Sequence, residues 1–328
     1  MAKSPVTNLR ISVVALPHDW LSPIRTGDVQ VPGLEVTFDH VTPIERFVVD
    51  SGHDAGEMSM ARMLLRWARG DHRFVPLPMY VYRSFVHREY FVRSDSSLAS
   101  LAELNGKRIA LAGWPNTGNT WARAVLREAG VAPESAEWLA SREEDPDAAH
   151  LGLTAPDYVE KTAERPLDLL LAGRVDAVVM GETPTEVRLP AGRLRRLYAD
   201  FPTAEKQYFA RTGIYPGHHI LGVRREVIER DPSILSRLYG GLEKARRLWF
   251  ERRADLEETS PWLAADIDAS IALFGGSWYQ DGISSEANRR MIRALHDEQV
   301  AEGLNHPAFD PLSVFQEFEQ GAKADVGG

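Results

Sequence analysis

The chain has 328 residues, of which 44% are hydrophobic and 26% charged, and its formal net charge is −9. This length predicts about two domains, each large enough for its own core. The absence of cysteine excludes disulfides, thiolate nucleophiles and cysteine-ligated metals. The acidic balance argues against general nucleic-acid binding. Only six of the 38 basic residues are lysine, so Schiff-base chemistry has few candidates, whereas arginines that bind carboxylates bidentately are plentiful.

The start of the chain predicts neither a secretory signal nor a membrane anchor. Its apolar run extends only from Ile11 to Leu16, is interrupted by Ser12 and is followed by Pro17. A signal peptide needs a longer apolar core and a small-residue cleavage site. No other stretch approaches the roughly 18 apolar residues of a membrane span. We therefore expect a cytoplasmic protein with no membrane partner.

Short apolar runs alternate with helical patterns along the first two thirds of the chain, which predicts an α/β fold with largely parallel strands. The predicted strands are, in chain order, Leu9–Leu16, Leu34–Val41, Val75–Arg83, Glu89–Arg93, Arg108–Ala112, Asp176–Met180, Leu194–Ala199 and Ile220–Arg224. Between them, the spacing of apolar residues predicts helices over Glu57–Arg69 and Thr120–Ala129. Gly130 follows the second helix as a typical C-terminal cap.

The last third of the chain is predicted to be almost entirely helical. Asp231-Pro232 is a typical start for a long helix that runs towards Arg253. Further helices are predicted over Pro261–Leu273, Ser285–Ala301 and Pro311–Glu319. No flexible linker or repeat separates this segment from the rest, so we expect the domains to be joined by short crossings.

Motifs for several common chemistries are missing. The chain contains no Gly-x-Gly-x-x-Gly, no phosphate-binding loop with its lysine, no Gly-x-Ser-x-Gly elbow and no His-Glu-x-x-His pair. Nucleotide hydrolysis, α/β-hydrolase chemistry and zinc-dependent proteolysis therefore have no support in the sequence.

Polar clusters follow several predicted strands, at the edge where open α/β sheets bind ligands. They contain His18 and Asp19 after the first strand, Glu57 and Ser59 near the next helix, Asn116, Thr117 and Asn119 at a helix start that attracts anions, and Glu182 after Met180. Two more clusters, Arg83–His87 and Thr212–His219, lie where the chain is expected to cross between domains.

Several of these residues also have a purely structural interpretation. Glu57 fits the first turn of a helix, where the dipole favours a carboxylate, and Arg83 fits an ion-paired residue. His218 and His219 are neighbours on a predicted strand, so their rings point to opposite faces and at most one faces a site. No third metal ligand lies in range. We therefore predict no cofactor. A divalent metal ion is not excluded, but the spacing of possible ligands does not support one.

Five short stretches carry a resemblance to known proteins. Leu104-Asn-Gly-Lys-Arg108 and Gly173-Arg-Val-Asp-Ala177 are common to binding-protein folds, whereas Glu57-Met58-Ser59, Arg83-Ser-Phe-Val-His87 and Thr212-Gly-Ile-Tyr-Pro216 are more specific. With these stretches the chain resembles the 4,5-dihydroxyphthalate decarboxylase family over nearly its whole length.

The resemblance implies a two-lobed, type 2 periplasmic-binding-protein-like α/β fold with a ligand cleft between the lobes and a helical C-terminal segment. Residues 1–92 and 215–328 are expected to form the first lobe, and residues 93–214 the second. The implied partner is a small aromatic carboxylate, and a homo-oligomer is compatible with it.

Decarboxylation of a hydroxylated aromatic acid requires a proton on the ring carbon that bears the carboxylate. We expect His87 to supply that proton, because imidazole titrates near neutral pH. Glu57 or His219 is expected to accept the phenolic proton, and Arg83, with Arg25, to hold a carboxylate. The remaining expected substrate contacts are His18, Asp19, Ser59, Asn116, Thr117, Asn119, Glu182, Tyr215 and His218.

Two other functions use the same architecture. A non-catalytic solute receptor has the same fold and cleft, so the fold alone does not decide between receptor and enzyme. A ligand-sensing regulator needs a DNA-binding segment, and none is evident before the first predicted strand. The catalytic interpretation is favoured over both.

Overall fold

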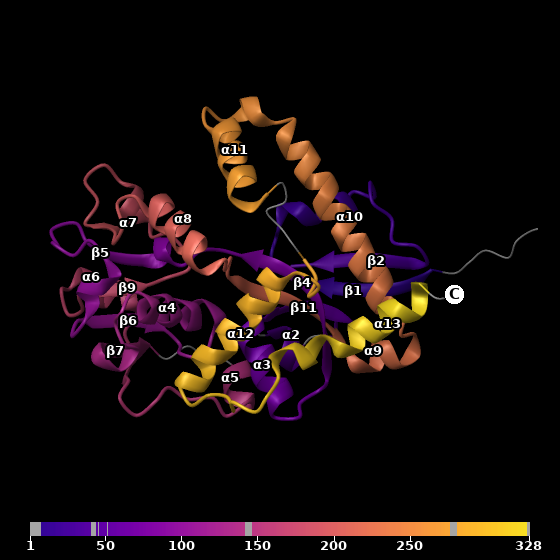
Figure 1. Cartoon of the computed structure of the whole chain (residues 1–328), viewed down its shortest axis with the longest axis horizontal. Helices are drawn as coiled ribbons and strands as arrows, with labels where there is room; N and C mark the ends of the chain where they lie inside the picture. The colour runs from indigo at the N-terminus through magenta and orange to yellow at the C-terminus, as the bar shows by residue number, and fades with distance from the viewer. Residues whose placement is uncertain are drawn as a thin grey trace, which may run out of the picture.

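The computed structural model describes residues 8–40, 44, 46–50, 52–141, 146–275 and 281–326. Two mixed β-sheets lie side by side along the long axis of the molecule, each with its own helices (Figure 1). The first sheet has the strand order β2-β1-β3-β11-β4, and the second has the order β10-β5-β9-β6-β7-β8.

The first sheet contains β1 (Leu9–Val14), β2 (Leu34–Asp39), β3 (Ala55–Ser59), β4 (Phe74–Arg83) and β11 (Gly217–Arg224). Strand β1 is parallel to β2 and β3, whereas β11 runs antiparallel between β3 and β4. The helices that follow these strands are α1 (Ser22–Arg25), α2 (Arg46–Asp50), α3 (Met60–Ala68), α9 (Arg225–Arg230) and α10 (Ile234–Ala254). Buried side chains such as Val13, Leu77 and Val223 form the core beneath α10.

The second sheet contains β5 (Tyr90–Arg93), β6 (Arg108–Ala112), β7 (Glu137–Ser141), β8 (Glu160–Thr162), β9 (Ala177–Val179) and β10 (Leu194–Arg196). Strands β6 to β9 pair in parallel, and β5 is antiparallel to both β9 and β10. Its helices are α4 (Thr117–Glu128), α5 (Pro146–His150), α6 (Pro166–Leu171), α7 (Thr185–Arg188) and α8 (Phe201–Thr212).

The chain crosses between the sheets twice, from Arg83 to Tyr90 and from Thr212 back to Gly217. These crossings coincide with the two polar clusters that were expected there. The exact lobe limits, 1–92 with 215–328 and 93–214, stay a prediction.

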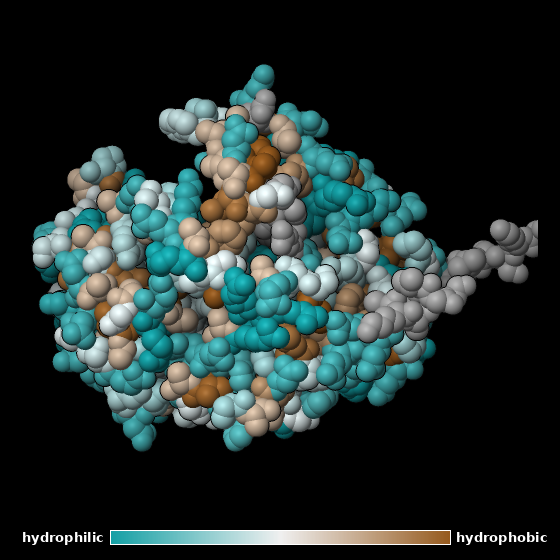
Figure 2. Space-filling view, viewed as in Figure 1, coloured by the Kyte–Doolittle hydropathy of each residue, from teal (hydrophilic) through white to brown (hydrophobic). Residues whose placement is uncertain are grey.

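The last helices are α11 (Leu263–Phe274), α12 (Glu286–Ala301) and α13 (Gln316–Val326). The C-terminal end of α10 and helix α11 extend from the body as an arm, whereas α12 packs against α4 of the second sheet (Figure 1). The surface is hollowed between this arm and α8, and apolar side chains of α11 are visible on the arm (Figure 2). None of the described helices is both long and apolar enough to cross a bilayer.

Buried contacts fasten α4 to the first sheet and to α12. The Trp121 indole N–H donates to the Gly217 carbonyl at 2.9 Å. The Arg123 guanidinium forms a bidentate pair with Glu302, and both side chains are fully buried. These contacts join residues that are 96 and 179 positions apart in the chain, so the two halves of the molecule depend on each other for their packing.

Several predictions about secondary structure are wrong. Residues 55–59, placed partly in a helix by their spacing, form the buried central strand β3, and α3 begins only at Met60. The sheets are mixed, because β11 and β5 run against their neighbours, but the other described strands of each sheet are mutually parallel, as the prediction of largely parallel strands expects. The predictions also missed β7 and α8, whereas α10 and α12 lie within a few residues of the expected helices.

Candidate active site

The side chain of Glu57, the middle residue of β3, lies at the centre of a polar cluster. Only 1% of this residue is exposed. Its carboxylate accepts hydrogen bonds from the Leu16 backbone N–H at 2.8 Å, from His18 Nε2 at 3.0 Å and from His219 Nδ1 at 2.6 Å. The residues come from the loop after β1, from β3 and from β11, so three separate segments meet at one carboxylate.

The hydrogen bonds keep Glu57 ionised despite its burial. Burial alone would raise the pKa of this carboxyl group, but the hydrogen bonds from His18 and His219 outweigh burial and lower the pKa well below its usual range. Because an ionised carboxylate only accepts, His18 Nε2 and His219 Nδ1 carry the protons of these bonds. The other nitrogen of each ring is then available to a ligand, and both side chains are partly exposed.

The aromatic ring of Tyr82 connects this cluster to His218. The Tyr82 ring centroid lies 5.5 Å from that of His219, 5.0 Å from that of His218 and 6.4 Å from that of His18. The sequence predictions did not include Tyr82. Tyr82 directly precedes Arg83 on β4, but only the pairing of β4 with β11 places its ring beside the two histidines.

The neighbouring histidines of β11 have different hydrogen-bond partners, although both rings lie against Tyr82, because the pairing of β11 with β4 is irregular at this point. His218 is buried, and its Nε2–H donates to the Ser84 carbonyl at 3.0 Å. Burial and the nearby His219 lower the pKa of His218 to about 3. His218 is therefore a neutral ring whose Nδ1 can only accept a hydrogen bond.

The start of α4 lies against this cluster. The Asn116 side chain caps the helix by accepting the Asn119 N–H at 2.8 Å, and the Asn119 amide donates to the Ala112 carbonyl. Thr117 Oγ1 lies 2.8 Å from Ser59 Oγ, so these two residues join the sheets. Gly118 follows Thr117, and the first N–H groups of a helix have no partner within the helix itself, which suits a negatively polarised ligand atom.

The guanidinium of Arg83 contacts residues of the protein interior. Its Nη2 donates to the Tyr215 carbonyl and to Asn288 Oδ1, both at 2.9 Å, and it lies over the rings of Tyr80 and Tyr215. Burial lowers the pKa of Arg83. These contacts hold the crossing segment in place, and the expected role of Arg83 as a carboxylate anchor stays a prediction.

His87 lies apart from the Glu57 cluster, between the rings of Tyr198 and Tyr208. Burial lowers its pKa to about 4, and its Nδ1 has no hydrogen-bond partner among the described residues. A group with this pKa is almost entirely unprotonated at pH 7. This environment suits a neutral packing residue better than a proton donor, and the catalytic role of His87 stays a prediction.

The structure gathers only some of the expected site residues. Glu57, His18 and His219 share hydrogen bonds, and Ser59, Thr117, Asn116 and Asn119 surround the adjoining helix start. Asp19, Arg25 and Glu182 are exposed, and no hydrogen bond joins them to the described part of the Glu57 cluster. Tyr215 lies at the second crossing, where its ring packs against Phe85 and Phe274.

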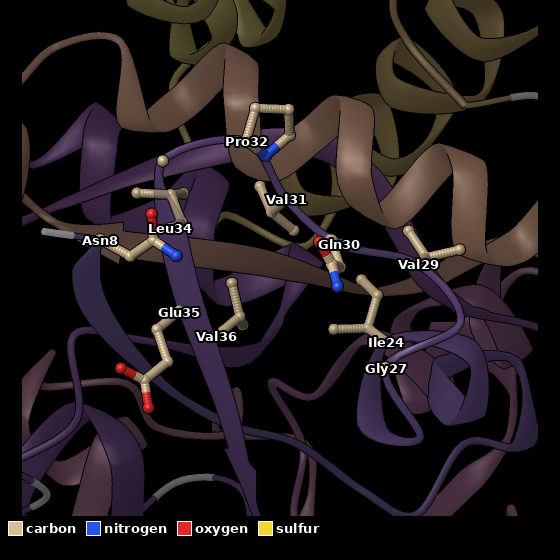
Figure 3. Close-up of a pocket in the computed structure, with 11 residues that line it drawn as sticks. Asn8, Ile24, Gly27, Val29, Gln30, Val31, Pro32, Leu34, Glu35 and Val36 are labelled. Carbon is tan, nitrogen blue, oxygen red and sulfur yellow. The ribbon is translucent and has the colours of Figure 1, made fainter. Parts of the chain in front are cut away.

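Within the described residues no group of three or more His, Asp and Glu side chains is arranged to hold a metal ion. A cavity of about 460 Å³ lies beside β2 and the loop after α1, but none of the predicted site residues lines it (Figure 3). We therefore keep the Glu57 cluster, and not this cavity, as the candidate site.

Replacement of Glu57 by glutamine should change how stability depends on pH. A carboxyl whose folded-state pKa lies below its unfolded value, near 4.5, stabilises the fold above that value and stops doing so as the pH falls through the folded pKa. We expect Glu57→Gln to cost about 1–3 kcal/mol at pH 7 and progressively less below pH 4.5. Thermal unfolding from pH 7 to pH 3 measures this, and a constant difference would contradict an ionised Glu57.

Comparison with known proteins confirms the family resemblance. The chain is 26% identical over 322 residues to 4,5-dihydroxyphthalate decarboxylase from Comamonas testosteroni, covering 94% of this chain and 97% of the relative. It is 26% identical over 220 residues to 4,5-dihydroxyphthalate decarboxylase from Pseudomonas putida, covering 64% and 85%. No protein-family model matches the chain.

Solved structures confirm the predicted fold class. The desulfurization enzyme DSZB superposes with a TM-score of 0.56 at 15% identity, covering 97% of this chain and all of that one. The periplasmic aliphatic sulphonate binding protein SsuA from Escherichia coli superposes with a TM-score of 0.54 at 15% identity, covering 94% and 91%. The chain therefore has a periplasmic-binding-protein-like fold and is similar in sequence, along almost its full length, to the 4,5-dihydroxyphthalate decarboxylases.

Proposed function

We propose that this protein is a carbon–carbon lyase that decarboxylates a hydroxylated aromatic carboxylic acid resembling 4,5-dihydroxyphthalate. The observation that carries the proposal is the ionised Glu57 carboxylate between two partly exposed histidines, in a chain similar over nearly its full length to decarboxylases of that name. The predicted lobes, 1–92 with 215–328 and 93–214, would supply opposite walls of the site.

The proposed reaction replaces a carboxylate by a proton. A ring hydroxyl ortho or para to the carboxylate-bearing carbon donates electron density while an acid protonates that carbon, which gives a dearomatised intermediate. The bond to the carboxylate then breaks, CO2 leaves, and the electron pair of that bond restores the aromatic ring. Loss of CO2 is favoured where water is excluded from the carboxylate.

We assign the proton donor to His219 in preference to His87. Glu57 accepts from His219 Nδ1 at 2.6 Å, an arrangement that orients the ring and fixes which nitrogen faces the carboxylate. The opposite nitrogen, Nε2, is then the one that delivers a proton. His18 shares the same carboxylate, so it is placed to exchange the proton through Glu57 or to contact the substrate carboxylate.

Turnover of a small panel of acids tests the proposal. Purified protein is incubated with 4,5-dihydroxyphthalate, phthalate and mono- and dihydroxybenzoates, and CO2 release is followed with and without a chelator. We expect release only from acids with a hydroxyl ortho or para to a carboxylate, and no effect of the chelator. Tight binding without release across the panel would favour a solute receptor, and loss of activity with the chelator would indicate a metal ion.

A further inference from the structure

Three polar atoms surround the backbone of Gly118 on the first turn of α4. A Cβ atom at Gly118 would lie 3.6 Å from His218 Nδ1, 3.7 Å from Asn116 Oδ1 and 3.8 Å from Glu89 Oε2. We call the space bounded by these atoms the Gly118 recess. The glycine leaves it open, and it adjoins the Glu57 cluster through the ring of Tyr82, which contacts both His218 and His219.

Glu89 is the unusual member of this recess. It lies on the first crossing segment, immediately before β5, and its carbonyl accepts the Met180 N–H at the end of β9. Only 3% of the residue is exposed, yet its carboxyl group forms no hydrogen bond within the described part of the chain. A buried carboxyl group without partners is costly, and this one plays no part in the packing contacts described above.

The charged groups around Glu89 have other partners. Arg88, beside it on the same segment, binds Glu205 of α8 through Nε at 2.8 Å, and Arg196 of β10 donates to Thr183 Oγ1 at 2.8 Å. His218 of β11 faces the recess as a neutral ring. Burial raises the pKa of Glu89 to about 8, and the nearby charges have smaller effects: Arg88 lowers it, Glu205 raises it and Arg196 lowers it least. Glu89 therefore carries a proton at neutral pH.

We propose that the Gly118 recess binds a ring hydroxyl of the substrate and that Glu89 donates a hydrogen bond to the hydroxyl oxygen. This inference rests on the proposed function and makes Glu89 a residue that determines specificity. The other two polar atoms that face the recess, His218 Nδ1 and Asn116 Oδ1, are acceptors. A carboxylate has no proton for them, whereas a hydroxyl donates to His218 and accepts from Glu89.

The proposal also places the reacting carbon. With its hydroxyl in the Gly118 recess, the ring lies beside Tyr82, and its carboxylate-bearing carbon points towards His219. The hydrogen bond that the hydroxyl donates to His218 Nδ1 increases the electron density on the hydroxyl oxygen, which assists its donation to the ring as the carbon is protonated. Recognition of the hydroxyl and activation of the ring thus involve the same contacts.

The test compares two ligands that have no hydroxyl ortho or para to a carboxylate, so the proposed reaction does not decarboxylate them. They are 3-hydroxybenzoate, whose hydroxyl is meta to its carboxylate as each hydroxyl of 4,5-dihydroxyphthalate is to one of its two carboxylates, and benzoate, which has no hydroxyl. Their dissociation constants are measured by titration calorimetry at pH 6.5 and pH 9. Loss of one buried hydrogen bond should reduce the preference of Glu89→Leu for 3-hydroxybenzoate about 10-fold, with benzoate binding unchanged. Glu89→Gln should keep the preference, because its amide still donates.

The pH dependence distinguishes this role from a structural one. Ionisation of Glu89 removes the donated proton, so the preference of the wild type should fall between pH 6.5 and pH 9 relative to that of Glu89→Gln, which cannot ionise. Ionisation of the ligand affects both proteins equally. Equal preferences at both pH values, or an unchanged preference in Glu89→Leu, would overturn the inference.

Gly118→Ala provides an independent variant in case Glu89→Leu fails to fold. The added methyl group fits at ordinary contact distances and suits a helix better than glycine, so the fold should be retained while 3-hydroxybenzoate binds at least 10-fold more weakly. Gly240→Ala in α10, which has open space around it, and Glu298→Gln, a buried glutamate paired with Arg127, are the matched controls and should bind both ligands normally.

The outcomes separate the inference from the proposed function. Turnover of 4,5-dihydroxyphthalate combined with an unchanged ligand preference in Glu89→Leu and Gly118→Ala would reject the recess alone. A hydroxyl preference that depends on Glu89 without turnover by the wild type would reject the decarboxylase and retain the recess. Failure of the wild type to bind either ligand would reject both.

Discussion

His219→Ala is expected to lower kcat for the hydroxylated aromatic acid by about 10²- to 10⁴-fold, the usual contribution of a positioned proton donor. The ring is partly exposed and belongs to the third residue of β11, so its removal leaves the core intact. KM should change much less than kcat, because the lost interaction belongs to the transition state. Steady-state CO2 release measures both constants.

Two histidine variants make this expectation specific. His53→Ala removes another histidine that pairs with a carboxylate, Asp39 at 2.9 Å, and should retain full activity. His87→Ala distinguishes the two candidate donors: the low pKa and buried position of His87 predict a change in stability with kcat within a few-fold of the wild type. A loss of kcat confined to His87→Ala would assign the proton to His87 and reject the role of His219.

Glu302→Leu is expected to destabilise the protein by about 3–5 kcal/mol, because it leaves the fully buried Arg123 guanidinium without its counter-charge. Arg123 Nη2 retains the Trp114 carbonyl at 3.1 Å and the guanidinium lies 3.9 Å from the centre of the Trp114 ring, but neither contact neutralises the charge. In a protein of this size, the unfolding temperature should fall by roughly 5–10 °C. Differential scanning calorimetry measures the shift.

Two further variants show that the effect comes from burial. Glu128→Leu breaks the exposed pair with Arg211, whose two hydrogen bonds are both 2.9 Å long, and should cost about 1 kcal/mol or less. The double variant Arg123→Met with Glu302→Leu removes both buried charges and should recover most of the lost stability. If Glu302→Leu were no more destabilising than Glu128→Leu, the buried Arg123–Glu302 pair would contribute no more to stability than an exposed pair does.

The elements that sequence reasoning predicted well are those specified by local signals. Helix α12 begins beside Ser285 and ends close to Gly303, within one residue of the prediction, because a cap and a glycine mark its ends. Strand β3 was mistaken for part of a helix for the opposite reason. Its five residues are all buried, and Met58 continues the apolar spacing of α3, so only pairing with β1 and β11 identifies it as a strand.

In the candidate site too, local signals were predictable from the sequence and long-range contacts were not. The sequence singled out Glu57, His18 and His219 as chemically suitable residues, but it treated Glu57 and His219 as alternatives, because nothing local indicates that residues 162 positions apart share a hydrogen bond. Glu89 was assigned only to the start of a strand. Its candidate role depends on its burial and on its closeness to Gly118 of α4 and His218 of β11, which are distant in the sequence.

The long-range contacts of Trp121 with Gly217 and of Arg123 with Glu302 affect how the protein folds during its synthesis. During synthesis, α4 leaves the ribosome long before its partners. Gly217 is made 96 residues after Trp121, and Glu302 is made 179 residues after Arg123. The second sheet can collapse early around its own core, but the surface of α4 that carries these two side chains stays uncovered until the chain is almost finished. Such late, long-range closure slows folding and lengthens the exposure of apolar surface. A nascent chain stalled before Glu302 should therefore be much more prone to aggregation and proteolysis than one stalled after α13.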